Sequence, residues 1–553
     1  MKRRKVMNLF LAAVLAGSAI LSGCGSSGSG SSGSGSSSGT TASVQSNSGG
    51  SGESVRSVSE VTADPSTPIS DTITIARAGS VQSLDPVEVA YTNDIQIINM
   101  VCEELMTTND EGTEIEGDLA QSWDISDDGL TYTFHLIPDL KFSDGNDVTA
   151  ADWEFSFDRA MTTENSPWTF AVSNIDSVEV PDDDTVVIHL KEKAANTLSG
   201  LSCFNVALQE KSQYDATNGY TEGNAWPIGT NSYAITENVA DDHITLTRNQ
   251  YFHGDAPKTE TLIFKTVSDD NSRVMMLQSG DVDIVTDLPY SSMEEINNMD
   301  GFTAVGLPST SNKYIILNET SNEALANKDV RKALLYATDK QTIVDMVLNG
   351  YGEPAVSFMS ENGLYYDDSI EDVGYDVDKA KELLSDAGYA DGFDLEILIP
   401  SGNDAYTQIA TILKDEWAQI GVNLTITSMD QAALYDDEYA MKHEVLIGSW
   451  SDDIADPSQL ADYWFNYDSS QAFFTGYKNE EASNIFEESQ VETDDSARED
   501  LYHQLQEIFY DDVVAINLYH QEITVAMSDS IQGYVETPLY AFRFDNLIKT
   551  EDL

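Results

Sequence analysis

A strand, helix and strand pattern between residues 394 and 426 constrains the fold more than any other feature of the chain. The segment 394–399 has the length and composition of a strand, and the segment from Val422 alternates apolar and polar residues. Between them, apolar residues recur at helical spacing, and Gly421 marks the end of that helix. The apolar residues of the helix are Ile409, Ile412, Leu413, Trp417 and Ile420. Because a helical crossover returns the chain in the same direction, the pattern predicts an α/β protein with parallel strands.

Shorter patterns of the same kind lie upstream. Ile73 and Ile75 have the period of two that is typical of a strand, and apolar residues at helical spacing follow between Asn93 and Leu105. A turn at residues 126–129 precedes two further alternating segments, Tyr132, Phe134 and Leu136, and then Val186, Ile188 and Leu190. We therefore expect antiparallel hairpins in this second section of the chain.

The N-terminus is typical of a signal peptide. Four basic residues, Lys2 to Lys5, precede a mostly apolar run from Val6 to Leu21 that is shorter than the ~20 residues needed to cross a bilayer. The run ends in Leu21-Ser22-Gly23-Cys24, which resembles a bacterial lipobox. The resemblance implies removal of residues 1–23 and a lipid on Cys24. We expect an extracytoplasmic protein that this lipid anchors to the outer face of the bacterial cell membrane.

Residues 24–70 form a polar segment without periodic apolar residues, and from Gly25 to Gly39 every residue is Gly or Ser. Such a composition cannot bury enough apolar surface to fold alone. We expect a flexible tether between the membrane and the folded part of the chain.

The charge of the chain excludes one class of partner. Lys and Arg number 28 against 95 Asp and Glu, so the formal charge is 28 − 95 = −67, and no basic cluster follows the first five residues. Binding to a phosphate backbone requires clustered Lys and Arg. We therefore expect no nucleic acid partner.

Motifs for catalysis and for metal or cofactor binding are absent from the sequence. The seven histidines never occur at i, i+4 spacing, and there is no P-loop, no C-x-x-C and no G-x-G-x-x-G after a predicted strand. We expect no metal site, no cofactor and no enzymatic activity. Cys102 and Cys203 form one candidate disulfide, but a chain with this much core does not need it, and we favour two buried free thiols.

Several segments together resemble the extracytoplasmic solute-binding proteins of peptide ABC transporters, of the oligopeptide and dipeptide type. The matches follow the family order over about 85% of the chain: Ser83-Leu84-Asp85-Pro86, 118–123, 130–136, 142–145 with 148–152, Ile228-Gly229-Thr230 before Tyr233, 246–249 with Tyr251, 330–334 with Asp339, and Trp450 followed by Asp456-Pro457. Each segment alone has little specificity, and the resemblance rests on the order and spacing of the segments.

The resemblance implies a two-lobed, three-domain α/β fold of the type II periplasmic-binding-protein kind, cluster C-like, with a hinge between the lobes. Its first domain would be discontinuous, at 71–105, 228–306 and 525–553, with the second domain at 106–227 and the third at 307–524. The lobes would close around a short peptide and present it to the permease subunits of an ABC importer. We expect a monomer.

The resemblance also suggests ligand-binding residues. In the family, a Trp followed three residues later by Asp places that carboxylate on the α-ammonium of the peptide, and here these residues are Trp450 and Asp453. Trp168 aligns with an aromatic residue that contacts the ligand, and Tyr91-Thr92 aligns with a strand that pairs with the peptide backbone. Some members carry an arginine three residues before the Trp to hold the peptide carboxylate, and here that position is Ile447.

Three other functions stay open at this point. The same fold serves nickel chelates, oligosaccharides and other solutes, because a fold does not fix a ligand. A secreted hydrolase would use some of the abundant carboxylates, although no catalytic motif supports it. The tether alone would also suit a surface adhesion module.

Overall fold

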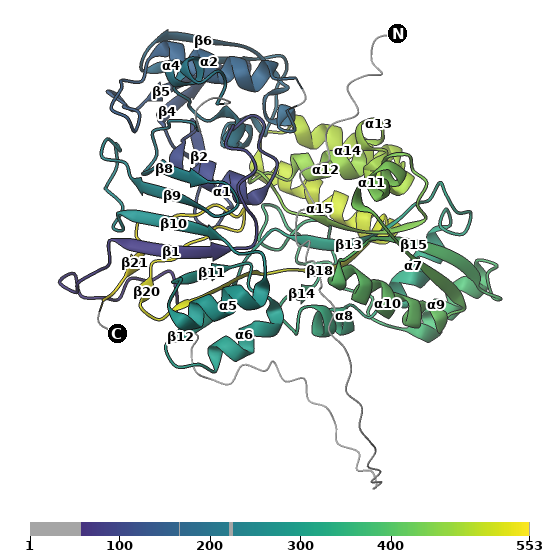
Figure 1. Ribbon diagram of the computed structural model, residues 1–553. Helices are drawn as coiled ribbons and strands as arrows, with labels where there is room; N and C mark the ends of the chain where they lie inside the picture. The colour runs from purple at the N-terminus through teal and green to yellow at the C-terminus, as the bar shows by residue number, and fades with distance from the viewer. Residues whose placement is uncertain (1–56, 165, 221–224, 552–553) are drawn as a thin grey trace.

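The computed structural model describes residues 57–164, 166–220 and 225–551. The signal peptide, Cys24 and most of the tether lie outside the described residues. In the described ranges, no helix is both long and apolar enough to cross a membrane. The described chain forms two lobes, one holding the early strands β1 to β12 and the other holding β13 to β18 (Figure 1).

The first lobe is built on a seven-stranded mixed sheet in the order β12-β19-β11-β1-β10-β9-β8. Its strands come from three separate parts of the chain: β1 (Thr72–Arg77), then β8 (Tyr233–Val239), β9 (His243–Arg248), β10 (Thr261–Thr266), β11 (Ile284–Thr286) and β12 (Phe302–Leu307), and finally β19 (Ile523–Ser528). The helices beside it are α1 (Thr92–Val101), α5 (Asp270–Ser279) and α6 (Tyr290–Asn297), and β20 (Ile531–Gln532) pairs with β21 (Ile548–Lys549).

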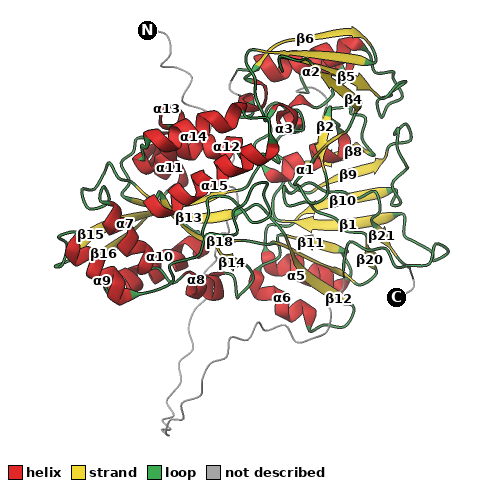
Figure 2. Cartoon of the chain, turned by 180° about the vertical axis from the view of Figure 1, so that it is seen from behind, coloured by secondary structure: helices red, strands yellow, loops and turns green. Residues whose placement is uncertain are grey.

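A smaller antiparallel sheet, β4-β5-β7-β6, lies at the far end of the same lobe, as the alternating segments predicted (Figure 2). Its strands are β4 (Ala120–Ile125), β5 (Thr131–Leu136), β6 (Ile175–Asp182) and β7 (Thr185–Leu190). The other elements of this section are β2 (Met106–Thr108), β3 (Ile115–Gly117), α2 (Ala150–Thr162), η1 (Thr169–Val172), α3 (Thr197–Gly200), η2 (Phe204–Val206) and α4 (Lys211–Ala216).

The second lobe contains a six-stranded sheet in the order β14-β18-β13-β17-β15-β16. Its strands are β13 (Asn312–Leu317), β14 (Glu353–Pro354), β15 (Phe393–Pro400), β16 (Val422–Met429), β17 (Val445–Trp450) and β18 (Ala515–His520). Its helices are α7 (Lys328–Tyr336), α8 (Lys340–Val347), α9 (Val377–Asp386), α10 (Asp404–Ala418), α11 (Gln431–Tyr439), α12 (Ser458–Phe465), α13 (Tyr467–Ser470), η3 (Ala472–Gly476), α14 (Glu480–Val491) and α15 (Asp495–Asp512).

The predicted strand, helix and strand are β15, α10 and β16, and the two strands pair in parallel. The Asn403 side chain caps α10 by accepting a hydrogen bond from the backbone N–H of Tyr406 at 2.9 Å. The apolar stripe of this helix, including Leu413 and Trp417, is fully buried against the sheet. The prediction for this segment is confirmed.

Alternate residues of the central strand β13 enter two different cores. Ile315 and Leu317 lie in the core that includes residues of α7, α8 and α10, whereas Tyr314 and Ile316 lie in the core that includes residues of α12 and α15. Figure 1 shows these two helix layers on opposite sides of the sheet. The period of two in a strand therefore decides which side chains of β13 face α10.

The predicted helix from Asn93 to Leu105 is too long, because α1 ends at Val101. The next residues are extended, and their carbonyl groups accept hydrogen bonds from other segments: Glu103 from Leu208 at 2.8 Å, and Glu104 from Leu119 at 3.1 Å. Gly229 packs so closely on the end of α1 that a Cβ atom there would collide with the Val101 carbonyl. Tertiary contacts thus end the helix, although its apolar spacing continues.

Candidate ligand-binding site

Two short connections join the lobes. Residues 308–311 link β12 to β13, and residues 521–522 link β18 to β19. The Gln521 backbone N–H donates to the Ser311 carbonyl at 3.0 Å, so the two connections lie side by side. The two crossings run antiparallel, as do the strands that they continue, and they form the hinge about which the lobes would move relative to each other.

Opposite this hinge connection, the lobes touch directly. The Asn196 side chain of the first lobe donates to the Ser458 hydroxyl of the second lobe at 2.8 Å, and the Ala195 N–H donates to the Gln490 carbonyl at 2.9 Å. Ile454 of the second lobe is buried in the first-lobe core with Trp168 and Phe204. The loop after β17 is therefore part of the boundary between the lobes.

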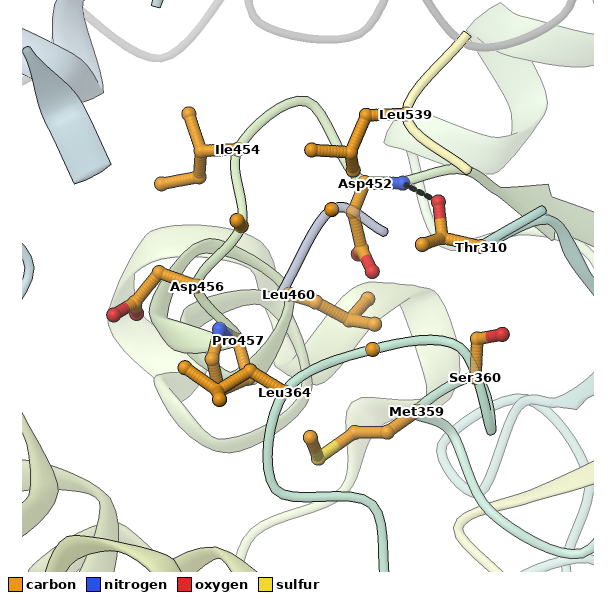
Figure 3. A pocket seen from close by; sticks show the side chains of 13 residues that line it. Thr310, Met359, Ser360, Leu364, Asp452, Ile454, Asp456, Pro457, Leu460 and Leu539 are labelled. Atoms are coloured by element: carbon orange, nitrogen blue, oxygen red, sulfur yellow. Dashed lines mark hydrogen bonds between the residues drawn. The ribbon is translucent and has the colours of Figure 1, made fainter. Parts of the chain in front are cut away.

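Trp450 ends β17 and orients the start of this loop. Its ring is buried against Tyr463 and Phe473, with centroid distances of 4.9 and 5.8 Å. Its indole N–H donates to the carboxylate of Asp452 at 3.0 Å, not to Asp453. Figure 3 shows the Asp452 carboxylate pointing into a pocket of about 310 Å³ that Thr310, Met359, Leu460 and Leu539 also line.

Asp453 is half-buried and accepts a hydrogen bond from the Gln459 side chain at 3.0 Å. Burial raises the pKa of the Asp453 carboxyl to about 7. Asp453 lies near Cys203 of the first lobe, and its charge contributes, after burial, to raising the pKa of that thiol. No Lys, Arg or His of the described ranges forms an ion pair with this carboxylate. An ammonium group of a ligand would supply the missing counter-charge.

Trp168 is buried in the first-lobe core with only 2% of its surface exposed. Its indole N–H donates to the Val89 carbonyl at 2.6 Å, and its ring meets that of Phe204 edge-on at 4.5 Å. The contact of Trp168 with the ligand stays a prediction. In the structure, its ring packs in the core that also contains Ile454. Cys102 and Cys203 are buried free thiols in the same core, as expected.

The expectation of a strand at Tyr91-Thr92 is wrong. Tyr91 is the N-cap of α1, and Thr92 is the first residue of that helix. The Tyr91 carbonyl accepts hydrogen bonds from the N–H groups of Asp94 and Ile95, so it closes the first helical turn instead of pairing with another strand. The Tyr91 side chain is 37% exposed, and it contributes to raising the pKa of Tyr435 in the second lobe after burial and other causes. Tyr91 thus lies near α11 of the second lobe.

A second pocket, with about 490 Å³ of empty space, lies between β17, α10 and α11. Beyond Leu446, β17 pairs with β13 on one side, while its pairing with β15 has ended. The pocket opens at this uncovered edge, and its lining includes Tyr406, Glu438, Ile447 and Ser449. Sequence reasoning missed Tyr406 and Glu438, because only the packing of α10 and α11 against β17 brings them together.

The comparisons with known proteins agree with this architecture. The sequence profile of the bacterial extracellular solute-binding proteins, family 5, matches residues 114–472. The chain belongs to this family. The expected two-lobed α/β fold of type II is confirmed, because solved structures of such binding proteins superimpose on the greater part of the chain.

Three relatives of this solute-binding protein illustrate the range of the family. A probable D,D-dipeptide-binding periplasmic protein of Escherichia coli is 27% identical over 85% of this chain and 92% of its own length. Heme-binding protein A of Haemophilus influenzae is 28% identical over 77% of this chain and 82% of its own length. A periplasmic binding protein of Helicobacter pylori, solved with the peptide STSA, superimposes with a TM-score of 0.74 at 25% identity, covering 87% of this chain and 98% of the other.

Proposed function

We propose that the protein is an extracytoplasmic receptor that captures short peptides and delivers them to an ABC importer. The observation that carries the proposal is Asp453, a half-buried carboxylate that lies near Cys203 of the opposite lobe and has no cation of the described chain as its partner. Each peptide with a free N-terminus carries an ammonium group, so one fixed anion serves many sequences. The dipeptide in the name of the Escherichia coli relative and the peptide bound to the Helicobacter pylori relative support a peptide over the nickel chelate or oligosaccharide alternative.

Pairing of the ligand backbone with a strand edge would give the breadth of specificity that a peptide receptor needs. The uncovered edge of β17 from Ile447 to Trp450 leads directly to Asp453. A peptide amine at Asp453 would therefore place the following residues within reach of this edge. In this proposal the transporter supplies ATP hydrolysis, and the chain has no catalytic activity of its own.

The domain boundaries given above are part of the proposal, since each proposed domain holds one of the three large sheets. We also propose that residues 1–23 are removed, that Cys24 carries the lipid, and that the receptor acts as a monomer at the outer face of the membrane. Replacement of Cys24 by Ala should release the protein from membranes or leave an uncleaved precursor. A variant that is still cleaved before residue 24 and lipid-labelled would contradict the anchor.

Native mass spectrometry of the purified protein tests the function most directly, because a closed cleft retains its ligand during purification. We expect adducts whose masses match peptides and which disappear on mild denaturation. Adducts with the mass of a metal chelate or a sugar, together with no binding of added peptides, would contradict peptide capture.

A further inference from the structure

The pocket between β17, α10 and α11 contains polar groups that the chain itself does not satisfy. The Tyr406 hydroxyl and one carboxylate oxygen of Glu438 are buried, and neither has a hydrogen-bond partner among the described residues. Most of the remaining lining is apolar, including Leu434, Leu446 and Phe473. Buried polar atoms without partners cost stability, so a pocket that keeps them is suited to a ligand that supplies partners.

Lys313 of the neighbouring strand places a positive charge beside this pocket, next to the lining residues Ser449 and Tyr406. Lys313 of β13 lies directly opposite Ser449 of β17, which lines the pocket. Its ammonium group lies 5.0 Å from the centre of the Tyr406 ring. Lys313 is two residues from Ile315, and Ile315 lies opposite Ile447, so Lys313 projects from the same face of the sheet as Ile447.

This face also holds the position at which the sequence departs from the resemblance. Ile447 occupies the position at which some family members carry an arginine, and it leaves that position apolar. Lys313 is on the adjacent strand, one repeat of the pleat nearer to the Trp450 end, a shift of about 7 Å. A positive group is therefore present beside the position, although the arginine itself is absent.

Lys313 differs from three other buried cations of the protein. Arg159 pairs with Asp85, Arg498 pairs with Asp456, and Lys340 pairs with Asp372, at 2.7, 2.7 and 3.0 Å. Lys313 is half-buried, yet its ammonium forms no ion pair or hydrogen bond with any described residue, in a chain with 95 acidic residues. Burial lowers the pKa of the Lys313 ammonium to about 8, and the Tyr406 ring is its visible partner.

We propose that Lys313 is a specificity-determining residue that binds a carboxylate of the ligand, with the Tyr406 hydroxyl as a second donor. This inference rests on the proposed peptide function, and it names the residue that would hold the anionic group of the ligand in the same site. The carboxylate comes either from the C-terminus of the peptide or from an acidic side chain, and both would present the same chemistry to the ammonium. Burial raises the pKa of Glu438 to about 7, so this carboxyl is partly neutral at physiological pH and repels an incoming carboxylate less.

The test compares matched ligands on matched variants by isothermal titration calorimetry with the full mature chain. The ligands are trialanine, trialanine amide, Ala-Glu-Ala and Ala-Gln-Ala. The variants are Lys313→Met, which keeps the length of the side chain, Lys313→Arg, which keeps the charge, and Lys442→Met. Lys442 is the control for net charge, since its side chain in the same lobe is 63% exposed and its pairing with Asp437 lies at the surface.

We expect wild type to lose about 10- to 100-fold in affinity when the carboxylate that Lys313 binds is replaced by an amide. Lys313→Met should bind the acid and the amide within about threefold of each other, since the two changes remove one interaction. Lys313→Arg should restore part of the discrimination, and Lys442→Met should behave as wild type. A loss of affinity from trialanine to trialanine amide identifies the C-terminus as the carboxylate that Lys313 binds. A loss from Ala-Glu-Ala to Ala-Gln-Ala identifies an acidic side chain.

Two outcomes overturn the inference in different ways. If wild type binds the tripeptides but does not distinguish acid from amide in either pair, or if Lys313→Met discriminates as wild type does, Lys313 is not the carboxylate partner and peptide binding stands. If none of the four tripeptides binds wild type, the peptide function fails and this inference fails with it.

Discussion

Two carboxylates three residues apart in the loop after β17 have opposite surroundings. Asp456 is buried and accepts two hydrogen bonds from the guanidinium of Arg498, at 2.7 and 2.9 Å. Asp453 accepts one neutral hydrogen bond from Gln459, and it lies near Cys203 of the other lobe. In Figure 3 the Asp456 side chain points away from Asp452 and the centre of the pocket. The comparison teaches that charges paired within one lobe maintain the fold, whereas charges left unpaired where the lobes meet are available to a ligand.

The largest expected effect comes from breaking the paired side of this comparison. Arg498→Met would leave the Asp456 carboxylate buried without its cation, which typically costs about 3–5 kcal/mol of folding stability. Arg498 also donates to the Ser489 carbonyl at 3.0 Å, so the variant loses a further contact to α14. We expect a clear fall in the midpoint of urea unfolding. Adding Asp456→Asn should recover part of the loss, and an unchanged midpoint in the single variant would show that the pair contributes nothing to stability.

Removal of the unpaired carboxylate should affect binding instead of folding. Asp453→Ala should weaken peptide binding by about 2–5 kcal/mol, since the ligand ammonium would be buried without an anion. The free energy of unfolding without ligand should change little, because no cation of the described chain forms an ion pair with Asp453. N-acetylation of the peptide removes the same charge from the ligand, so it should weaken binding to wild type strongly and to Asp453→Ala only slightly. Additive losses in this cycle would exclude Asp453 as the partner of the amine.

The affinity for peptide should depend on pH through the ionisation of the same carboxyl group, that of Asp453. The pKa of Asp453 is raised to about 7 without ligand, and a ligand ammonium would favour its ionised form, so protons compete with the ligand. Between pH 7.5 and pH 5.5 the ionised fraction of a group with this pKa falls from about three quarters to about 3%, so affinity should fall roughly 25-fold. Lys313 stays mostly charged over this range, so its contribution to the change in affinity is small.

Calorimetry at these two pH values measures the effect, and Asp453→Asn provides the control. This variant has no proton to exchange at residue 453, so its weaker affinity should be nearly independent of pH. A wild-type affinity that does not change on acidification would mean that the ammonium does not bind at Asp453.

The sequence predicted those features that depend on local pattern. The β15, α10 and β16 unit follows from apolar spacing and one glycine, and the antiparallel sheet follows from alternation. The end of α1 was missed, because hydrogen bonds from Leu208 and Leu119 hold the residues after it in an extended conformation. Lys313 was missed for a related reason, since its position depends on the pairing of strands that are more than 120 residues apart in the chain. The ligand contacts taken from the resemblance stay predictions, and the strand expected at Tyr91-Thr92 is wrong because the chain forms a helix there.

The smallest expected effect concerns the contact between the lobes. The Asn196 side chain donates to the Ser458 hydroxyl across the boundary, and a neutral hydrogen bond of this kind contributes about 1 kcal/mol. Because an open receptor cannot make this bond, Asn196→Ala should reduce the closed population and weaken peptide binding about three- to sixfold without touching the ligand. The backbone bond from Ala195 to Gln490 stays and limits the loss. Asn174→Ala is the matched control, since it removes a 2.8 Å bond to the Glu192 carbonyl within the first lobe. Small-angle scattering without ligand should show a larger radius of gyration for Asn196→Ala only, and equal affinities for the two variants would mean that this bond does not hold the lobes together.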